Sequence, residues 1–169
     1  MRTIILTEAQ AGELAKQMGK QKPICYIMCG IPGSGKSTWI KNNLPVEIPI
    51  VSRDIIRAEL GMSKSADDKF VGSREQEQEV TKHEYDKIRE LANTQQNFVI
   101  DDTNTGQFRA PLIDFVRSFG YSIYGINLHT DVETCIQRRE GQIPEDVMRK
   151  INAKIRFIDP SEVDKVFDV

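Results

Sequence analysis

The chain has 169 residues, a length that fits one α/β domain able to bury about 70% of its unfolded surface. Its 23 basic and 25 acidic residues give a net charge of −2, which argues against a protein that coats nucleic acid, although a pocket for one strand end needs only a few arginines. No apolar run approaches the roughly 20 residues of a membrane span, and the run at residues 4–6 is too short for a secretory signal, so we expect a cytoplasmic protein with no membrane partner.

Residues 1–22 precede the first predicted strand and contain a match to a helix capping box, Thr7-x-x-Gln10. The match predicts a helix over residues 7–18 that ends at Gly19. We therefore assign residues 1–22 to an accessory helix and residues 23–169 to one main domain.

A glycine-rich segment follows the first predicted strand, the apolar run at residues 24–29. Residues 30–38 read GIPGSGKST and match G-x-x-x-x-G-K-S/T between a strand and a helix, the setting that this pattern requires. Such a loop aims backbone N–H groups and a helix dipole at a nucleoside triphosphate. We expect the phosphates to contact Gly30, Pro32, Gly33, Ser34, Gly35, Lys36, Ser37 and Thr38. Lys36 would reach the β- and γ-phosphates, and Ser37 would offer its hydroxyl to Mg²⁺.

Beyond this loop, apolar strands alternate with helical patterns, which indicates a three-layer α/β domain with a mostly parallel, five-stranded sheet. We expect the other strands at residues 48–51, 97–101, 121–128 and 163–169. We expect helices from residue 38, at 53–60, from a capping box at 73–76 through residue 92, at 107–119, from a cap at 130–133 to residue 139, and at 144–158.

Ser52, Arg53 and Asp54 follow the second strand, at the edge of an open parallel sheet where ligands bind. Asp54 has two interpretations: a carboxylate that orients an acceptor hydroxyl and takes its proton, or an acid that stabilises the first helical turn. Arg57 lies one turn further on the same side. Its guanidinium could hold an acceptor phosphate, or it could be an exposed arginine that pairs with Glu59 or stays solvated.

Four polar residues follow the third strand: Asp101, Asp102, Thr103 and Asn104. Asp101 has the position of a Walker B acid, which reaches Mg²⁺ directly or through water. Two adjacent acids at a buried edge favour a compensating cation. Turn and capping roles would explain Thr103 and Asn104 equally well.

Arg138 and Arg139 lie between two predicted helices, just before residues 140–144. A helical lid that carries arginine could close over a nucleotide and place positive charge near the transferred phosphoryl group. The alternative is a favourable contact of these arginines with the helix dipole.

Together these segments resemble the kinase domain of phage-type polynucleotide kinases, within the P-loop kinase superfamily. The resemblance covers residues 24–158 and rests on residues 30–39, 52–57, 100–104 and 138–144. The phosphate-binding loop alone is unspecific within the superfamily. The Arg-Asp-x-x-Arg segment, combined with the Asp-Thr-Asn segment, is more specific.

The resemblance implies transfer of the γ-phosphate of ATP, with Mg²⁺, to the 5′-hydroxyl of a nucleic acid. Asp54 matches the general base, and Arg57 matches the residue that holds the acceptor phosphate. Arg138 matches a lid arginine at the triphosphate. The lid is short here, and Arg139 is the candidate for a second lid arginine. The remaining acceptor contacts would come from Arg53, Asp102, Thr103 and Asn104.

Two other functions fit the sequence. A kinase of a small metabolite, such as a nucleoside or a sugar nucleotide, agrees with the slightly acidic charge balance. A nucleotide-dependent switch without acceptor chemistry would retain Lys36 and Ser37 but would have no use for Asp54 and Arg57. The fold alone does not separate the three.

Overall fold

The computed structural model of the chain describes residues 22–65, 72–104, 106 and 108–169. It contains a five-stranded sheet in the order β2-β3-β1-β4-β5, in which all neighbouring strands are parallel. The strands are β1 (Ile24–Cys29), β2 (Ile50–Val51), β3 (Phe98–Ile100), β4 (Ser122–Asn127) and β5 (Lys165–Asp168). The predicted α/β class and five-stranded sheet are confirmed. The helix expected at residues 7–18 lies outside the described residues.

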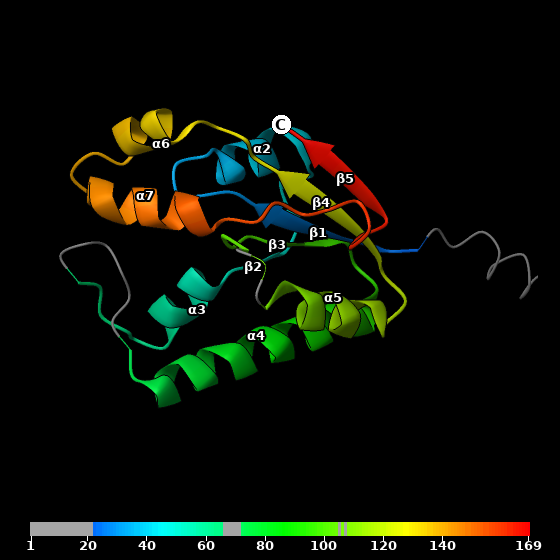
Figure 1. The fold of residues 1–169 in the computed structure, drawn as a ribbon. Coiled ribbons are helices and arrows are strands. Elements are labelled where there is room, and N and C mark those ends of the chain that lie inside the picture. The colour runs from blue at the N-terminus through cyan, green and yellow to red at the C-terminus, as the bar shows by residue number, and fades with distance from the viewer. Residues whose placement is uncertain (1–21, 66–71, 105, 107) are drawn as a thin grey trace, which may run out of the picture.

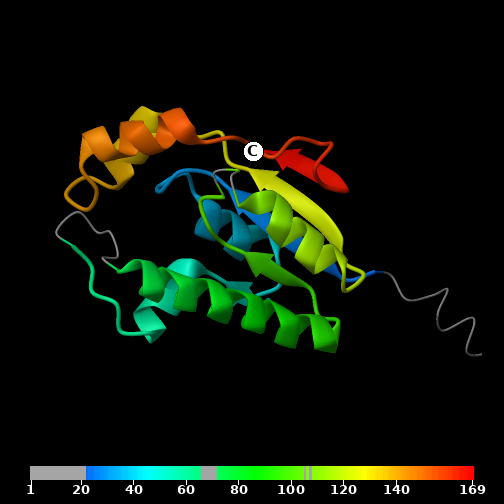
Figure 2. The same cartoon turned by 60° about the horizontal axis from the view of Figure 1, so that its bottom comes forward.

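Six helices surround this sheet in the described part of the chain: α2 (Lys36–Asn43), α3 (Arg53–Glu59), α4 (Arg74–Thr94), α5 (Arg109–Arg117), α6 (Val132–Arg138) and α7 (Glu145–Lys154). Helices α4 and α5 lie on one side of the sheet and α2 lies on the other (Figure 1). Helices α3, α6 and α7 lie beyond the carboxyl ends of the strands, and a second view shows α6 and α7 standing across from α3 (Figure 2). These three helices therefore lie around the carboxyl edge of the sheet, where the predicted site residues are located.

Strand β1 shows how the sequence builds the two faces of the sheet. Side chains alternate between faces along a strand. Cys25, Ile27 and Cys29 accordingly pack in the core that includes α4 and α5, whereas Met28 packs with Ile40 of α2 on the opposite face. A strand buried on both faces reads as a continuous apolar run, which is why residues 24–29 were identifiable from sequence.

Helix α4 begins at the predicted capping box. The Ser73 hydroxyl accepts a hydrogen bond from the Gln76 N–H at 3.2 Å, and the Gln76 side chain accepts one from the Ser73 N–H at 2.8 Å. Buried residues recur every fourth position, at Val80, Glu84, Ile88 and Ala92. One of the four, Glu84, is an acid, and it forms an ion pair with Arg53 of α3.

The last helix is shorter than predicted: it ends at Lys154 rather than near Ile158. The cause is tertiary hydrogen bonding. The Arg156 carbonyl accepts a bond from the Arg109 guanidinium at 2.8 Å, and the Ile158 N–H and C=O both pair with the Asn127 side chain. These backbone groups therefore bond to side chains of other elements and are not available to continue α7.

The start of α6 also differs from the prediction. Asp131, not Thr130, is its N-cap, and the Asp131 carboxylate accepts a hydrogen bond from the Thr134 N–H at 2.9 Å. The Thr130 hydroxyl instead donates to the Ser34 carbonyl at 2.8 Å. This bond ties the loop after β1 to the segment after β4.

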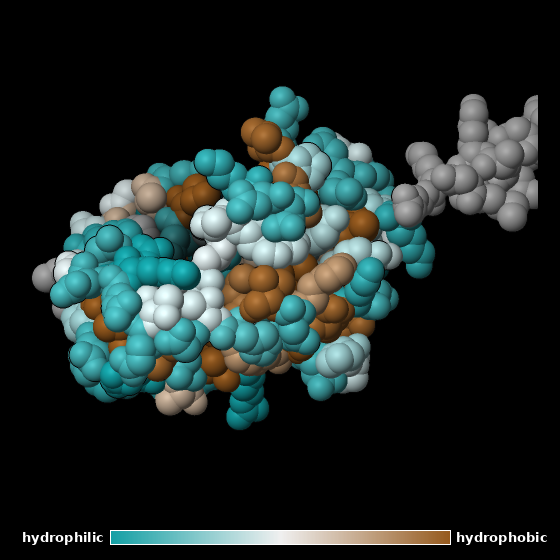
Figure 3. Space-filling view, turned by 90° about the horizontal axis from the view of Figure 1, so that it is seen from above, coloured by the Kyte–Doolittle hydropathy of each residue, from teal (hydrophilic) through white to brown (hydrophobic). Residues whose placement is uncertain are grey.

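Within the described ranges, no helix combines the length and apolar character needed to cross a membrane. The face seen from above is largely hydrophilic, with apolar side chains gathered in small patches (Figure 3).

Candidate active site at the carboxyl edge of the sheet

The loop between β1 and α2 has the conformation of a phosphate cradle. Gly33 and Gly35 adopt positive φ angles of 83° and 99°, which favour glycine, and Gly35 is the N-cap of α2. A Cβ added to Gly30 would lie 2.5 Å from the Ser34 hydroxyl oxygen, so this position also needs glycine. The Lys36 ammonium donates to the Gly30 carbonyl at 2.8 Å, and burial lowers the pKa of Lys36.

Helices α6 and α7 contact this loop through a hydrogen bond and an apolar cluster. The Arg138 guanidinium donates to the Gly33 carbonyl at 3.0 Å. Ile31 packs with Cys135 and Met148 in a small apolar cluster between the loop and the two helices. Arg139 is half-buried and donates to the Gln142 side chain at 2.9 Å. Arg138 thus bonds to the loop, whereas Gln142, the partner of Arg139, lies between α6 and α7.

Asp101 follows β3 and faces the loop. Its N–H donates to the Val51 carbonyl at 2.9 Å. Burial raises the pKa of Asp101, and the charge of Lys36 and a hydrogen bond from Ser37 partly offset that rise. One carboxylate oxygen, Oδ1, is buried without a hydrogen-bond partner among the described residues. A buried carboxylate oxygen without a partner, next to the Ser37 hydroxyl, is a donor set that fits Mg²⁺, which prefers oxygen ligands.

Asp102 is more deeply buried and points toward α3 and α4. Its Oδ1 accepts a hydrogen bond from the Arg53 N–H at 3.0 Å, whereas its Oδ2 has no partner among the described residues. Burial, followed by the negative charge of Glu84, raises the pKa of Asp102 to about 8. The raised pKa favours the protonated form of this side chain.

Asn104 shapes the turn after β3. It has a positive φ of 49°, and its side-chain amide donates to the Met28 carbonyl at 2.7 Å. The Asn104 carbonyl in turn accepts a bond from the Arg109 guanidinium at 2.8 Å. The turn role considered from sequence is therefore present in the structure.

Asp54 and Arg57 lie on one side of α3, as their spacing predicts. The Arg57 guanidinium donates to the Asp54 carboxylate at 2.7 Å. Its Nε and Nη2 also donate to Glu77 of α4, at 2.9 and 3.0 Å. The alternative pairing of Arg57 with Glu59 is wrong, because Glu59 pairs with Lys87 at 2.7 Å.

Arg53 is engaged by α4. Its guanidinium donates to Glu84 at 2.7 Å, and to Thr81 and Glu77 at 3.1 Å each. Sequence reasoning missed Glu77 and Glu84. Glu84 could have been found, because it lies midway between Val80 and Ile88 in the apolar stripe of the helix, where an acid needs a buried partner.

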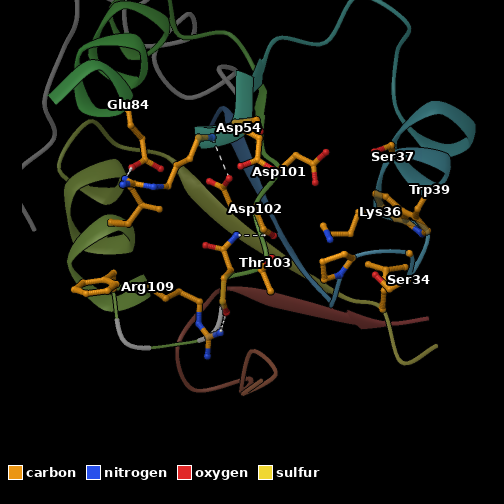
Figure 4. A pocket seen from close by; sticks show the side chains of 18 of the residues that line it. Ser34, Lys36, Ser37, Trp39, Asp54, Glu84, Asp101, Asp102, Thr103 and Arg109 are labelled. Carbon is orange, nitrogen blue, oxygen red and sulfur yellow. Dashed lines mark hydrogen bonds and ion pairs between the residues drawn. The ribbon is translucent and has the colours of Figure 1, made fainter. Parts of the chain in front are cut away.

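The predicted site residues and the acids Glu77 and Glu84 meet at one cleft of about 1590 Å³. Among the predicted site residues, Gly30 alone is not part of its lining. Lys36, Ser34, Ser37 and Trp39 lie at one end, Asp54 and the residues after β3 lie in the middle, and Glu84 and Arg109 lie at the far end (Figure 4). Sites for single small ligands span roughly 300–1,000 Å³, so this cleft has room for a donor and an acceptor.

A family model described as an AAA domain matches residues 26–156. The chain belongs to this AAA-domain family. The matched range begins within β1 and ends after α7, so it contains the whole of the cleft's loop, acids and lid arginines. No curated protein matches the chain.

Solved structures share the fold of this AAA-domain protein. A chain of the Pnkp1/Rnl/Hen1 RNA repair complex matches with a TM-score of 0.68 at 23% identity, over 83% of this chain and 46% of that chain. A sugar kinase from Janibacter sp. HTCC2649 matches with a TM-score of 0.59 at 17% identity, over 88% of this chain and 86% of that chain. The APS kinase CysC of Mycobacterium tuberculosis matches with a TM-score of 0.56 at 15% identity, over 88% of this chain and 90% of that chain.

The chain spans 40% and 46% of the lengths of the two matched chains from the Pnkp1/Rnl/Hen1 complex. The likeness to these proteins shows a P-loop kinase fold.

Proposed function

We propose that this AAA-domain protein is an ATP-dependent kinase that transfers the γ-phosphate to the 5′-hydroxyl of a nucleic acid. The observation that carries the proposal is the pairing of Asp54 with Arg57 in the cleft that also contains Lys36, Ser37 and Asp101. A carboxylate and a guanidinium across from a phosphate-binding loop supply a base and an anion contact for an acceptor.

The phosphate-binding loop would hold the donor. Backbone N–H groups of residues 33–38 would bind the phosphates at the N-terminus of α2, and Lys36 would exchange its bond to the Gly30 carbonyl for phosphate oxygens. Arg138 would add positive charge from the lid side. Ser37 and Asp101 would hold Mg²⁺, which, when bound, neutralises charge on the β- and γ-phosphates.

The acceptor would bind on the side of α3. Asp54 would orient the attacking hydroxyl and accept its proton as the hydroxyl oxygen bonds to the γ-phosphorus. The bond between that phosphorus and the β–γ bridging oxygen would break, and ADP would leave. Arg57 would hold a phosphate of the acceptor with donors that now bind Glu77. Thr103 would line the acceptor side of the same cleft, and the bonds of Arg53, Asp102 and Asn104 described above would fix the surrounding backbone.

A kinase of a small metabolite is the second candidate. It is favoured by the net charge of −2 and by the two acids, Glu77 and Glu84, that line the acceptor side of the cleft. Proteins described as a sugar kinase and as an APS kinase share the fold.

Transfer of labelled γ-phosphate from ATP distinguishes the two candidates. The acceptors would be a 5′-hydroxyl oligonucleotide, the same oligonucleotide with a 5′-phosphate, and a panel of nucleosides and sugars. We expect label on the 5′-hydroxyl oligonucleotide alone, and none with Lys36→Ala, which removes the phosphate contact. Label confined to a small molecule would replace the proposal with the second candidate.

A further inference from the structure

The cleft continues beyond the carboxylates, away from the phosphate-binding loop. Its far end lies between α4 and α5, where Figure 4 shows Glu84 and Arg109 opposite Lys36 and Ser37. We call this end the acceptor arm. Its lining includes four residues with apolar surface: Tyr85, Phe108, Pro111 and Leu112.

Phe108 is exposed to 77% although it lines the arm. A lone exposed phenylalanine is ordinary on a protein surface and is not a site by itself. Here, however, the phenylalanine lines the cleft and directly precedes a buried arginine. The next residue, Arg109, is 4% exposed, and its guanidinium bonds to Glu162 and to the Asn104 and Arg156 carbonyls, each at 2.8 Å. Phe108 therefore lies at the rim of the cleft, next to the most heavily hydrogen-bonded arginine in the described part of the structure.

Tyr85 supplies a second aromatic ring to the lining of the arm. It is half-buried on α4, and its ring centroid lies 4.6 Å from that of Phe115 of α5. This contact limits the rotation of the Tyr85 ring. The arm is therefore bordered by aromatic rings from α4 and from the start of α5.

The chemistry of the arm favours one class of acceptor group. Aromatic side chains bind nucleobases by stacking, because every base has a flat π-face. A sugar, in contrast, presents hydroxyls that need hydrogen-bonding partners, and the polar side chains at this end, Glu84 and Arg109, are already paired with Arg53 and Glu162. We propose that Phe108 and Tyr85 form a nucleobase-binding subsite for the 5′-terminal nucleotide of the acceptor. The proposal rests on the proposed kinase function and names the part of the acceptor that this arm recognises.

Steady-state kinetics with matched acceptors tests the subsite. One oligonucleotide carries a base at its 5′-terminal residue, and the other is abasic there. Because stacking on one aromatic contributes about 1–3 kcal/mol, Phe108→Ala should raise the KM for the base-bearing acceptor roughly 5- to 150-fold. The KM for ATP should not change. Phe108→Trp should retain the wild-type KM, and Phe157→Ala, which removes an exposed ring outside the cleft lining, is the matched control.

The abasic acceptor supplies the decisive comparison. Wild type should lose affinity for it, and Phe108→Ala should cause no further loss, because the base that the ring contacts is absent. An equal KM increase for both acceptors, or none for either, would overturn the subsite.

A second readout does not depend on turnover. A 2-aminopurine at the 5′-terminal residue should be quenched on binding to wild type and should stay bright with Phe108→Ala and with Tyr85→Leu. Equal quenching by wild type and both variants would contradict stacking. If wild type phosphorylates only sugars, the proposed function itself fails, whereas oligonucleotide transfer with an unchanged KM in Phe108→Ala removes the subsite alone.

Discussion

Asp102 has an environment that couples its protonation to stability. Its pKa is raised to about 8, first by burial and then by the charge of Glu84, whereas an aspartate in an unfolded chain titrates near 3.9. Between about pH 4 and about pH 8, the folded state therefore binds a proton that the unfolded state has released. The contribution of Asp102 to the free energy of unfolding is present at low pH and is lost as the pH rises through 8.

Asp102→Asn removes this titration. In magnesium-free buffer we expect the free energy of unfolding of wild type to fall more between pH 5 and pH 8 than that of the variant. Urea unfolding at both pH values measures the difference. Parallel pH profiles for the two proteins would show that Asp102 is ionised in the folded state.

The residues of the phosphate-binding loop could be predicted because their signal is local: nine consecutive residues and the strand before them. The partners of the predicted arginines could not. Arg57 binds Glu77, 20 residues away, and Arg109 binds Glu162, 53 residues away. Nothing in the spacing of such pairs distinguishes them from other oppositely charged residues.

At the scale of elements, the pair of Glu84 and Arg53 joins α4 to the first residue of α3. Glu84 is 4% exposed, so Glu84→Ala leaves Arg53 with its weaker contacts to Thr81 and Glu77. We expect a loss of about 1–3 kcal/mol in the free energy of unfolding, the usual cost of removing one partner of a buried hydrogen bond. Urea unfolding measures it.

Glu79→Ala is the control on the same helix. Its side chain is half-exposed, and surface substitutions change stability by about 0.5 kcal/mol or less. A loss in Glu84→Ala no larger than in Glu79→Ala would mean that the buried pair does not stabilise the docking of α3.

The existence and order of the helices and strands were accessible from sequence, whereas some boundaries were not. Apolar runs and the capping box at Ser73 are strong signals within short stretches of sequence. The end of α7 depends instead on Arg109 and Asn127, which use the backbone groups of residues 156–158. Helix ends set by distant side chains carry no local pattern.

At the scale of the whole molecule, Arg109 joins α5, the turn after β3 and the segment before β5. Arg109→Met keeps much of the volume but removes the donors for three carbonyls and the ion pair with Glu162. We expect a loss of about 3 kcal/mol and a Tm lower by roughly 6–12 °C in thermal unfolding.

Arg117→Met tests the specificity of that effect. Arg117 is on the same helix but is more exposed, and its pairing distance to Asp164 is 3.9 Å. We expect its Tm to stay close to wild type. An equal Tm for Arg109→Met and wild type would remove the assigned role of Arg109 in holding the acceptor arm.

The small net charge of the whole molecule predicts a modest dependence on salt. One or two phosphate contacts to a single strand imply that the KM for an oligonucleotide rises about three- to sevenfold between 50 and 200 mM salt. An uncharged nucleoside acceptor should show no such rise in its own KM. Initial rates at four salt concentrations measure both, and a salt-independent oligonucleotide KM would argue against a phosphate contact at Arg57.

The central claim is that Asp54 is the base of a phosphoryl transfer. The most direct measurement compares wild type, Asp54→Asn and Asp114→Asn, the last an exposed acid on α5 outside the cleft lining. We expect Asp54→Asn to lower the turnover number on a 5′-hydroxyl oligonucleotide by about 10²- to 10⁴-fold. Its calorimetric affinity for ATP should remain, and Asp114→Asn should match wild type in both. Full turnover in Asp54→Asn would contradict the claim.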